Sequence, residues 1–256
     1  MSLTEEQSPV RDTLRAIFFD LDNTLLDHTS AAREAMRHVH GHYGELFQGL
    51  PFNRVFEEWV TINDRFWHDY SAGLLTPTQL RVERLRALTE WTCVQCGLDA
   101  GAHDASIEEM SERYLGRIVS GSAAYDGVAG MLESLRGRYI LGVISNGFTD
   151  VQLGRLRSTG LDTYFDHIIL SEDVGVSKPD PRIFHLALEA AGTAASETLY
   201  IGDNFLYDIG GASGAGLGTI WFNRSGAAAP AVVPEIHPGA VAGSIPELAR
   251  LLGVPF

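Results

Sequence analysis

Two hydrophobic patterns divide the chain into segments of different kinds. Short, uninterrupted apolar runs that end in polar residues or glycine predict strands buried on both faces of a sheet. Such runs occur at Arg15–Asp20, Tyr139–Ile144, His167–Leu170, Thr198–Ile201 and Thr219–Phe222. Between about Ser30 and Ser120, apolar residues instead recur at helical spacing, which predicts three or four helices and no strand.

Capping residues indicate where the helices begin and end. The expected N-caps are Asn53, Thr76 and Asp180, and the expected stops are Gly73, Gly97 and Gly192. Pro181 strengthens the assignment at Asp180, because proline suits the first helical position. Further helices are predicted at about Val128–Arg136, Asp150–Ser158 and Pro246–Leu252.

The alternation of strands and helices predicts an α/β fold, with a Rossmann-like parallel sheet and helices on both of its faces. This core domain would comprise residues 1–27 and 122–256. An α-helical domain, residues 28–121, would be inserted after the first strand. The stretch Gly226–Gly243, rich in Ala, Pro and Gly, is interpreted as a surface connection.

The acidic composition limits the partners. The 256 residues include 19 Lys and Arg against 33 Asp and Glu, for a formal net charge of −14. Because no run is rich in Lys or Arg, neither a nucleic acid polymer nor an anionic membrane surface is an expected partner. The first residues show no secretory signal, and no stretch approaches the ~20 apolar residues of a membrane-spanning helix. We expect a cytoplasmic protein, a monomer or homodimer, that acts on a small molecule.

Candidate chemistry gathers where the predicted strands end, which is where open parallel sheets bind ligands. These ends carry four carboxylates, one hydroxyl and one ammonium, from Asp20, Asp22, Asp203, Asp208, Ser145 and Lys178. Two carboxylates about 4 Å apart repel by about 4 kcal/mol at an effective dielectric of about 20, so either burial raises their pKa values or a cation neutralises the cluster. The lysine supplies one positive charge, and the all-oxygen ligand set favours Mg²⁺ as the other.

Four motifs carry a resemblance to a known family. In chain order they are Phe18–Leu25, Val143–Gly147, Ser177–Pro181, and Ile201–Asp203 with Asp208. Together they resemble the motifs of the haloacid dehalogenase superfamily of hydrolases, over nearly the whole chain from Arg15 onward. The resemblance implies the α/β fold predicted above, and the helical insert resembles that family's first type of cap domain.

The resemblance implies catalytic roles for the motif residues. Asp20 would be the nucleophile that forms an aspartyl-phosphate, and Asp22 would protonate the leaving oxygen and then activate water. Ser145 and the Asn146 amide would hold phosphoryl oxygens, and Lys178 would neutralise charge on the transferring group.

The same resemblance implies a Mg²⁺ site and supporting residues. The metal ligands would be Asp20, Asp203 and the backbone carbonyl of Asp22. Asp208 would orient either a metal-bound water or the catalytic lysine. Thr24, counted with the phosphate-binding residues, would support the loop by hydrogen bonding.

Asp22 also bears on the type of reaction. The dehalogenases that named the family use no metal and lack an Asp at this position, so the resemblance favours phosphomonoester hydrolysis. The alternatives are a phosphoglucomutase-type phosphotransferase, a 2-haloacid dehalogenase and a binding protein without turnover.

A finer resemblance concerns the substrate. The chain is similar to bacterial pyrimidine-type nucleoside 5′-monophosphate phosphatases at Ile62–Leu74, Ser145–Gly147, Ser171–Gly175 and Pro234–Pro238. Nucleoside 5′-monophosphates or similar small phosphorylated metabolites are therefore the expected substrates. The core is also similar to the N-acylneuraminate 9-phosphate phosphatases. N-acylneuraminate 9-phosphate and other sugar phosphates are therefore alternative substrates.

Other conspicuous residues have plainer interpretations. The glycines from Gly210 to Gly218 and the pair Cys93 and Cys96 are interpreted as helix-packing features, not as a dinucleotide or redox site. Alternating histidines would surround a helix instead of sharing one face of it, at His38, His40 and His42. The aromatic residues of the insert are expected mainly in its core, although one or two could stack on a base: Trp59, Phe66, Trp67 and Tyr70.

Overall fold

The computed structural model of the chain describes residues 13–230 and 236–255. The chain divides into two compact units, one made of Met1–Asp27 with Ala123–Phe256 and the other of His28–Ser122. The first is an α/β unit and the second is helical. The expectations for the first 12 residues, and the part of the Pro234–Pro238 resemblance before Ile236, lie outside the described residues.

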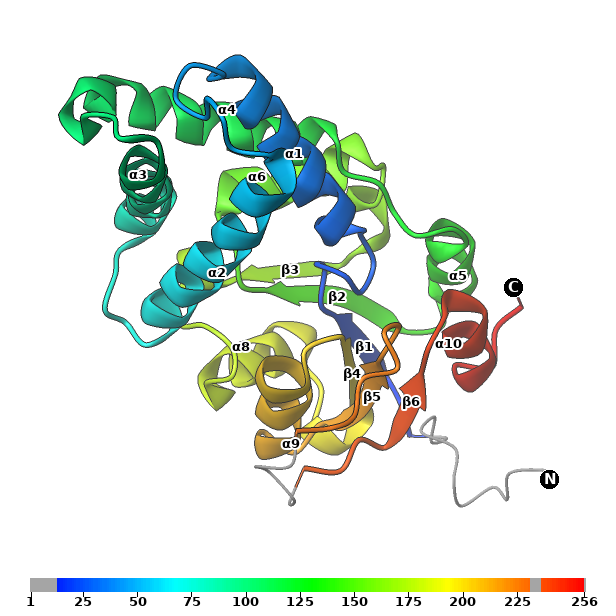
Figure 1. Cartoon of the computed structure of the whole chain (residues 1–256). Coiled ribbons are helices and arrows are strands. Elements are labelled where there is room, and N and C mark those ends of the chain that lie inside the picture. Colours follow the sequence, from blue (N-terminus) through cyan, green and yellow to red (C-terminus); the bar gives the residue numbers. More distant parts are fainter. Residues whose placement is uncertain (1–12, 231–235, 256) are drawn as a thin grey trace. The chain divides into compact units, whose positions relative to one another are not determined.

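A six-stranded parallel sheet forms the centre of the α/β unit (Figure 1). Its order is β3-β2-β1-β4-β5-β6, and every neighbouring pair is parallel. In the register, Phe19 lies opposite Val143 on one side and Ile201 on the other. The strands are β1 (Ala16–Phe19), β2 (Ile140–Ser145), β3 (His167–Leu170), β4 (Thr198–Gly202), β5 (Gly218–Phe222) and β6 (Ala240–Ala242). This confirms the predicted fold class.

Helices pack on both faces of this sheet, as the apolar strands require. Alternate residues of β1 point to opposite faces, so that Ile17 and Phe19 join one apolar cluster and Ala16 and Phe18 join another. The first cluster includes side chains of α5 (Val128–Leu135), α6 (Thr149–Ser158) and α10 (Ile245–Leu251). The second includes those of α8 (Pro181–Ala191) and α9 (Gly211–Gly214). Burial on both faces holds the strand ends in fixed positions.

Two short elements of the α/β unit escaped prediction. The stretch read as a surface connection contains β6, an edge strand of three residues in which only Ala242 is buried. Its short, alanine-rich sequence has little intrinsic strand preference, so pairing with β5 decides its conformation. The segment after β3 forms α7 (Ser171–Val174). Short helical turns occupy Asp162–Tyr164, Ala195–Glu197 and Phe205–Gly210.

Helices joined by turns and loops make up the second unit, whose residues 28–122 are all described and contain no strand, as predicted. Its helices are α1 (His28–His42), α2 (Phe52–Ser71), α3 (Pro77–Cys96) and α4 (Ile107–Ser120), with a 3₁₀ segment at Ala100–Ser106. In its core, Trp59 Nε1 donates a hydrogen bond of 3.2 Å to the Tyr114 hydroxyl. Cys93 and Cys96 are free thiols within α3.

One of the predicted caps in this unit is wrong. Thr76 caps α3 through a capping box with Gln79, and Gly97 ends the helix in the left-handed conformation. Asn53, by contrast, lies inside α2, which begins at Phe52 after Pro51. The helix therefore starts two residues earlier than expected, after Pro51, whose ring fixes φ. The Asn53 side chain instead accepts a hydrogen bond from Arg33.

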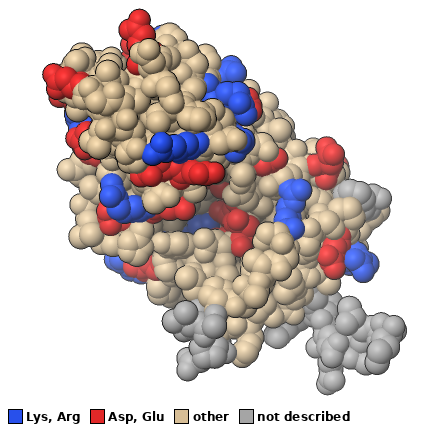
Figure 2. All heavy atoms as spheres, in the orientation of Figure 1, with Lys and Arg blue, Asp and Glu red and all other residues tan. Residues whose placement is uncertain are grey.

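In the described part of the chain, no helix is both long enough and apolar enough to cross a bilayer. On the face drawn in Figure 2, the Lys and Arg side chains are interspersed with Asp and Glu.

Candidate active site

A tight turn after β1 places Asp20 at the carboxyl edge of the sheet. The Asp20 N–H donates to the Ile201 carbonyl at 2.8 Å, which extends the β1–β4 pairing by one residue. Asn23 then adopts a positive φ of 59°, a conformation that Asn tolerates better than most residues. The turn closes with a 2.8 Å hydrogen bond from the Asn23 N–H to the Leu26 carbonyl. The Asp20 side chain is thereby held at a buried position beside the ends of β2 and β4.

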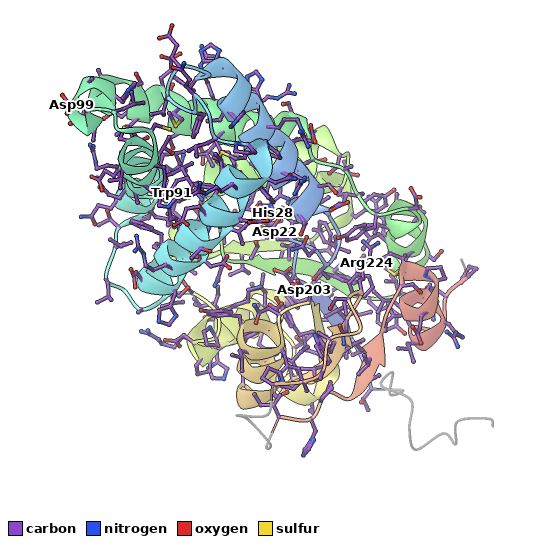
Figure 3. The ribbon with its side chains drawn as sticks, viewed as in Figure 1. Asp22, His28, Trp91, Asp99, Asp203 and Arg224 are labelled. Carbon is purple, nitrogen blue, oxygen red and sulfur yellow. The ribbon has the colours of Figure 1, made fainter. Side chains whose placement is uncertain are left out.

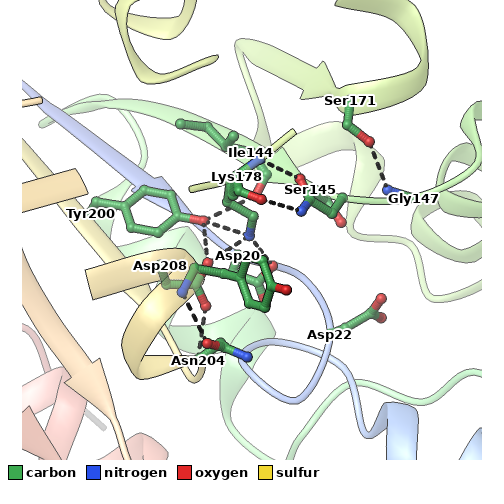
Figure 4. A network of polar contacts seen from close by, with 12 residues as sticks. Asp20, Asp22, Ile144, Ser145, Gly147, Ser171, Lys178, Tyr200, Asn204 and Asp208 are labelled. Atoms are coloured by element: carbon green, nitrogen blue, oxygen red, sulfur yellow. Dashed lines mark hydrogen bonds and ion pairs between the residues drawn. The ribbon is translucent and has the colours of Figure 1, made fainter. Parts of the chain in front are cut away.

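Lys178 is the centre of a buried charge network (Figure 4). Its Nζ donates to Asp20 Oδ1 at 2.7 Å, to Asp208 Oδ1 at 2.6 Å and to the Tyr200 hydroxyl at 3.0 Å. The two carboxylates belong to segments that follow different strands, as the strand-end argument required. The structure therefore brings Asp20, Asp208 and Lys178 together as predicted.

Tyr200 is a member of this network that sequence reasoning missed. Its hydroxyl lies 3.0 Å from the Ile144 carbonyl and 3.1 Å from Asp208 Oδ1, in addition to its contact with Lys178. Tyr200 lies inside the buried strand β4, and the apolar pattern of that strand does not distinguish it from its neighbours. The available signal was its hydroxyl, because a fully buried tyrosine needs a polar partner.

Main-chain contacts fix Asp208 in place. Asn204 caps the helical turn Phe205–Gly210 by accepting hydrogen bonds from the next main-chain N–H groups, and its own N–H donates to Asp208 Oδ2 at 2.9 Å. Gly202 at the end of β4 makes room for this carboxylate, since a Cβ there would lie 2.4 Å from Asp208 Cγ. A glycine is thus required for packing at this point.

Asn146 supports Lys178 through its side-chain amide. Asn146 Nδ2 donates to the Lys178 carbonyl at 2.9 Å, and Asn146 Oδ1 accepts from the Lys178 N–H at 2.8 Å. Because the side chain is used in this way, the main-chain N–H is the amide group of Asn146 that these contacts leave open. Asn146 directly follows Ser145, the last residue of β2.

Three carboxylates form a group suited to a metal ion. One oxygen from each of Asp20, Asp203 and Asp208 lies within 4.8 Å of the others. Asp20 Oδ2 is buried and has no hydrogen-bond partner among the described residues, so a cation would satisfy it. Carboxylate oxygens are the ligands that Mg²⁺ prefers. The residues present therefore fit a magnesium ion.

The electrostatics of the carboxylates point the same way. Burial, together with the charges of Asp208 and Asp22, raises the pKa of Asp20 to about 7 despite the opposing charge of Lys178. Burial and then the charge of Asp20 raise the pKa of Asp203 to about 9. Although burial acts to lower the pKa of Lys178, its carboxylate neighbours hold that pKa well above its ordinary value. One lysine is too little positive charge for this cluster.

The Asp22 carboxylate lies to one side of the Lys178 network in Figure 4 and is outside the three-carboxylate group. It pairs with Arg155 of α6, and Gln152 Nε2 of the same helix donates to Asp22 Oδ2 at 3.1 Å. Gln152 Nε2 also donates to Ser145 Oγ at 2.9 Å. Both α6 residues escaped prediction. The signal would have been two polar residues on the buried face of the helix that follows Ser145.

The expectation for Thr24 is wrong in one respect. Its side chain is completely buried, but its hydroxyl oxygen has no hydrogen-bond partner among the described residues. The main-chain hydrogen bonds at Asn23 and Leu26 hold the loop instead. By contrast, Asp203 lies where it was expected, beside Asp20 and Asp208, and Figure 3 labels it together with Asp22.

Comparison with known proteins agrees with this geometry. Residues 14–216 match the family model for haloacid dehalogenase-like hydrolases. The chain is 32% identical over 237 residues to the pyrimidine 5′-nucleotidase YjjG of Escherichia coli, covering 92% of this chain and 96% of the relative. It is 28% identical over 247 residues to the N-acylneuraminate-9-phosphatase of Mus musculus, covering 93% and 94%.

A solved structure has the same fold. The HAD-hydrolase YfnB from Bacillus subtilis, described as bound to magnesium, superposes with a TM-score of 0.77 at 28% identity, covering 94% of this chain and 99% of that one. The agreement of family model, curated relatives and fold extends over both units of the chain. The chain belongs to the haloacid dehalogenase-like hydrolase family.

Proposed function

We propose that this enzyme is a Mg²⁺-dependent phosphomonoester hydrolase that acts on nucleoside 5′-monophosphates or similar small phosphorylated metabolites. The observation that carries the proposal is the Asp20 carboxylate. One of its oxygens is held by Lys178, and the other is buried without a hydrogen-bond partner among the described residues. The phosphatase and nucleotidase names of the similar proteins support the same reaction class.

In the proposed reaction, an Asp20 oxygen attacks the phosphorus and the bond to the leaving oxygen breaks. Asp22 gives a proton to that oxygen, which leaves an aspartyl-phosphate on Asp20. Asp22 then takes a proton from water, the water attacks phosphorus, and the acyl–phosphate bond breaks to regenerate Asp20. Ser145 and the Asn146 main-chain N–H donate to phosphoryl oxygens.

We assign the magnesium ligands to Asp20, Asp203 and the main-chain carbonyl of Asp22. When bound, the ion supplies positive charge that offsets the negative charge of the carboxylates and the phosphoryl group. Lys178 contributes to the same charge balance through its contact with Asp20, while Asp208 holds the ammonium in position.

The helical unit is assigned the role of a cap that selects the substrate and excludes water from the phosphoryl transfer. We assign residues 28–121 to the cap and residues 1–27 with 122–256 to the catalytic core. The partner is a small phosphorylated metabolite, with no nucleic acid polymer or membrane involved. We place this activity in the cytoplasm, in a monomer or homodimer.

A panel of phosphomonoesters, assayed for phosphate release with Mg²⁺ and with chelator, tests the proposal. Nucleoside 5′-monophosphates, sugar phosphates and N-acylneuraminate 9-phosphate belong in the panel. We expect release that requires Mg²⁺ and is greatest for a nucleoside 5′-monophosphate. If N-acylneuraminate 9-phosphate or a sugar phosphate is preferred, the substrate assignment is wrong and the reaction class stands.

Asp20→Asn should lower kcat by about 10³-fold or more, because the amide is a poor nucleophile. Asp126→Asn, a matched change at an exposed turn of the same unit, should leave kcat unchanged. Equal activity of Asp20→Asn and wild type would refute the nucleophile. Phosphate transfer only to an added sugar, or chelator-insensitive halide release from 2-haloacids, would replace hydrolysis by the corresponding alternative reaction.

A further inference from the structure

Two polar side chains on the buried face of α6 are not explained by the proposed reaction. Gln152 is 2% exposed and Arg155 is 1% exposed. Burying an amide and a guanidinium is unfavourable unless their hydrogen bonds are made, so their partners define what they do. Those partners include Asp22 and Ser145, which both belong to the motifs.

The direction of every hydrogen bond in this group follows from Arg155. A guanidinium can only donate, so the 2.8 Å contact between Arg155 Nη1 and Gln152 Oε1 makes that oxygen the acceptor. The orientation of the Gln152 amide is then fixed, with Nε2 as the donor. Its two protons serve Ser145 Oγ at 2.9 Å and Asp22 Oδ2 at 3.1 Å.

Ser145 Oγ is therefore an acceptor in its contact with Gln152. A hydroxyl has one proton to donate, and the hydrogen bond found for Ser145 Oγ among the described residues does not use it. That proton is available to a ligand at the end of β2. A free serine hydroxyl could instead rotate and would lose entropy on binding.

The Gln152 amide packs directly against Gly147, where a larger residue would not fit. A Cβ at Gly147 would lie 2.6 Å from Gln152 Nε2 and 2.7 Å from its Cγ, closer than real contacts allow. The φ of Gly147 is not positive, so backbone conformation does not require a glycine there. The close approach of the Gln152 side chain does.

We propose that Gln152, oriented by Arg155, is a positioning residue that presents the Ser145 hydroxyl as a hydrogen-bond donor to a phosphoryl oxygen. The proposal rests on the function proposed above, because Ser145 is taken to hold the phosphoryl group. It adds that the α6 amide sets the strength of that contact. Asp22 shares the same donor, which ties the position of the acid to that of the phosphate-binding hydroxyl.

A double-mutant cycle on phosphate binding tests this inference. The variants are Gln152→Met, which keeps the side-chain length and removes the donor, Ser145→Ala, and the two together. The readout is the Kd of inorganic phosphate with Mg²⁺, measured by calorimetry. In the otherwise wild-type chain, we expect Gln152→Met to weaken phosphate binding about five- to tenfold. In the Ser145→Ala background, the same substitution should weaken it less than about twofold.

Two further variants make the result independent of a folding defect. Gly147→Ala leaves Gln152 in the chain but displaces its amide, and it should weaken phosphate binding to a similar extent. Arg157→Gln changes an exposed residue of the same helix and should leave the Kd unchanged. Circular dichroism establishes that each variant is folded.

The outcomes separate the two proposals. If wild type hydrolyses phosphomonoesters and the two substitutions act additively on the Kd, the role of Gln152 is wrong and the proposed function stands. If wild type binds phosphate and the cycle shows the expected coupling between Gln152 and Ser145, but wild type hydrolyses none of the panel, the proposed function is wrong and the positioning role stands. If wild type neither binds phosphate nor releases it, both are overturned.

Discussion

The ammonium of Lys178 lies between two buried carboxylates, and its position explains why this one residue matters to both stability and reaction. Each of Asp20 and Asp208 accepts a hydrogen bond from it, and all three side chains are nearly inaccessible to solvent. A buried network of charges such as this one adds little to the free energy of unfolding, because the cost of removing the charges from water offsets the attraction between them. Removing one member is different, since it leaves charge buried without compensation.

Lys178→Met should lower the free energy of unfolding by about 3–5 kcal/mol at pH 8, because Asp20 and Asp208 lose their counter-charge. Urea denaturation measures this. The double variant Lys178→Met with Asp208→Asn should recover part of the loss, since one of the two repelling carboxylates is gone. A double variant no more stable than the single one would contradict the electrostatic explanation.

The raised pKa of Asp203 predicts how stability depends on pH without divalent ions. The folded value of about 9 exceeds the ordinary value of 3.8, so the protonated form is favoured in the folded protein. This group's contribution is complete below its unfolded pKa and is lost as pH rises through the folded value. Wild type should therefore lose stability between about pH 4 and pH 9.

Asp203→Asn removes this titration, and its advantage over wild type should grow with pH. With EDTA present, we expect the variant to melt several degrees above wild type at pH 8.5, on the basis of about 2–4 °C for each kcal/mol, and with a smaller advantage at pH 5. Differential scanning calorimetry at both values measures the difference. A constant difference would show that Asp203 is not destabilised by burial and charge.

At the scale of elements, α7 explains how α6 starts at the right place. Phe148, the residue before α6, has no capping side chain. Glu172 of α7 replaces the missing cap by accepting a hydrogen bond of 2.6 Å from the Thr149 N–H, and Asp173 accepts one of 2.6 Å from the Thr149 hydroxyl. A short helix that the sequence pattern did not predict thus anchors the helix that carries Gln152.

Glu172→Ala should lower the free energy of unfolding by about 0.5–2 kcal/mol, the usual effect of losing an N-terminal cap. Chemical denaturation measures it. Glu189→Ala, at an exposed site on α8, is the matched control and should change stability by less than about 0.5 kcal/mol. If the two variants were equally stable, the capping role of Glu172 would be wrong.

At the scale of the whole molecule, the helical unit leaves and re-enters the α/β unit at one place. The Asp27 N–H donates to the Ala123 carbonyl at 2.9 Å, and the Tyr125 N–H donates to the Leu25 carbonyl at 3.0 Å. Leu26 and Ala124 pair as an antiparallel bridge between these two segments. Because the departing and returning chains are bonded to each other, a long insert does not interrupt the sheet that positions the site.

Magnesium should stabilise the folded protein if the carboxylate group binds it. At a concentration of 100 times Kd, binding contributes about 2.7 kcal/mol, which corresponds to a rise of about 5–10 °C in Tm. A thermal melt with and without Mg²⁺ at pH 8 measures this rise. Asp203→Asn should abolish most of it, and an undiminished rise in that variant would place the ion elsewhere.

Local patterns were sufficient to predict most elements and the residues at the strand ends. Each of these patterns is encoded within a few neighbouring residues. They are the uninterrupted apolar runs, the helix caps such as Thr76 and Asp180, and the alternation of strands with helices. Because the carboxyl ends of parallel strands lie at the same edge of a sheet, the strand order also predicted that Asp20, Asp203 and Asp208 lie close together. Strand β6 was missed, since its three residues have little strand preference of their own.

The sequence by itself determined the fold class and the chemical identity of the groups at the sheet edge, because both follow from short-range periodicity and from strand order. Only the tertiary structure decided which of these groups are partners. Asp22 pairs with Arg155, far along the chain, and Tyr200 reaches Lys178 from inside a strand. Such pairings depend on how helices and strands pack at a scale of a few ångström, and no local pattern in the chain specifies that distance.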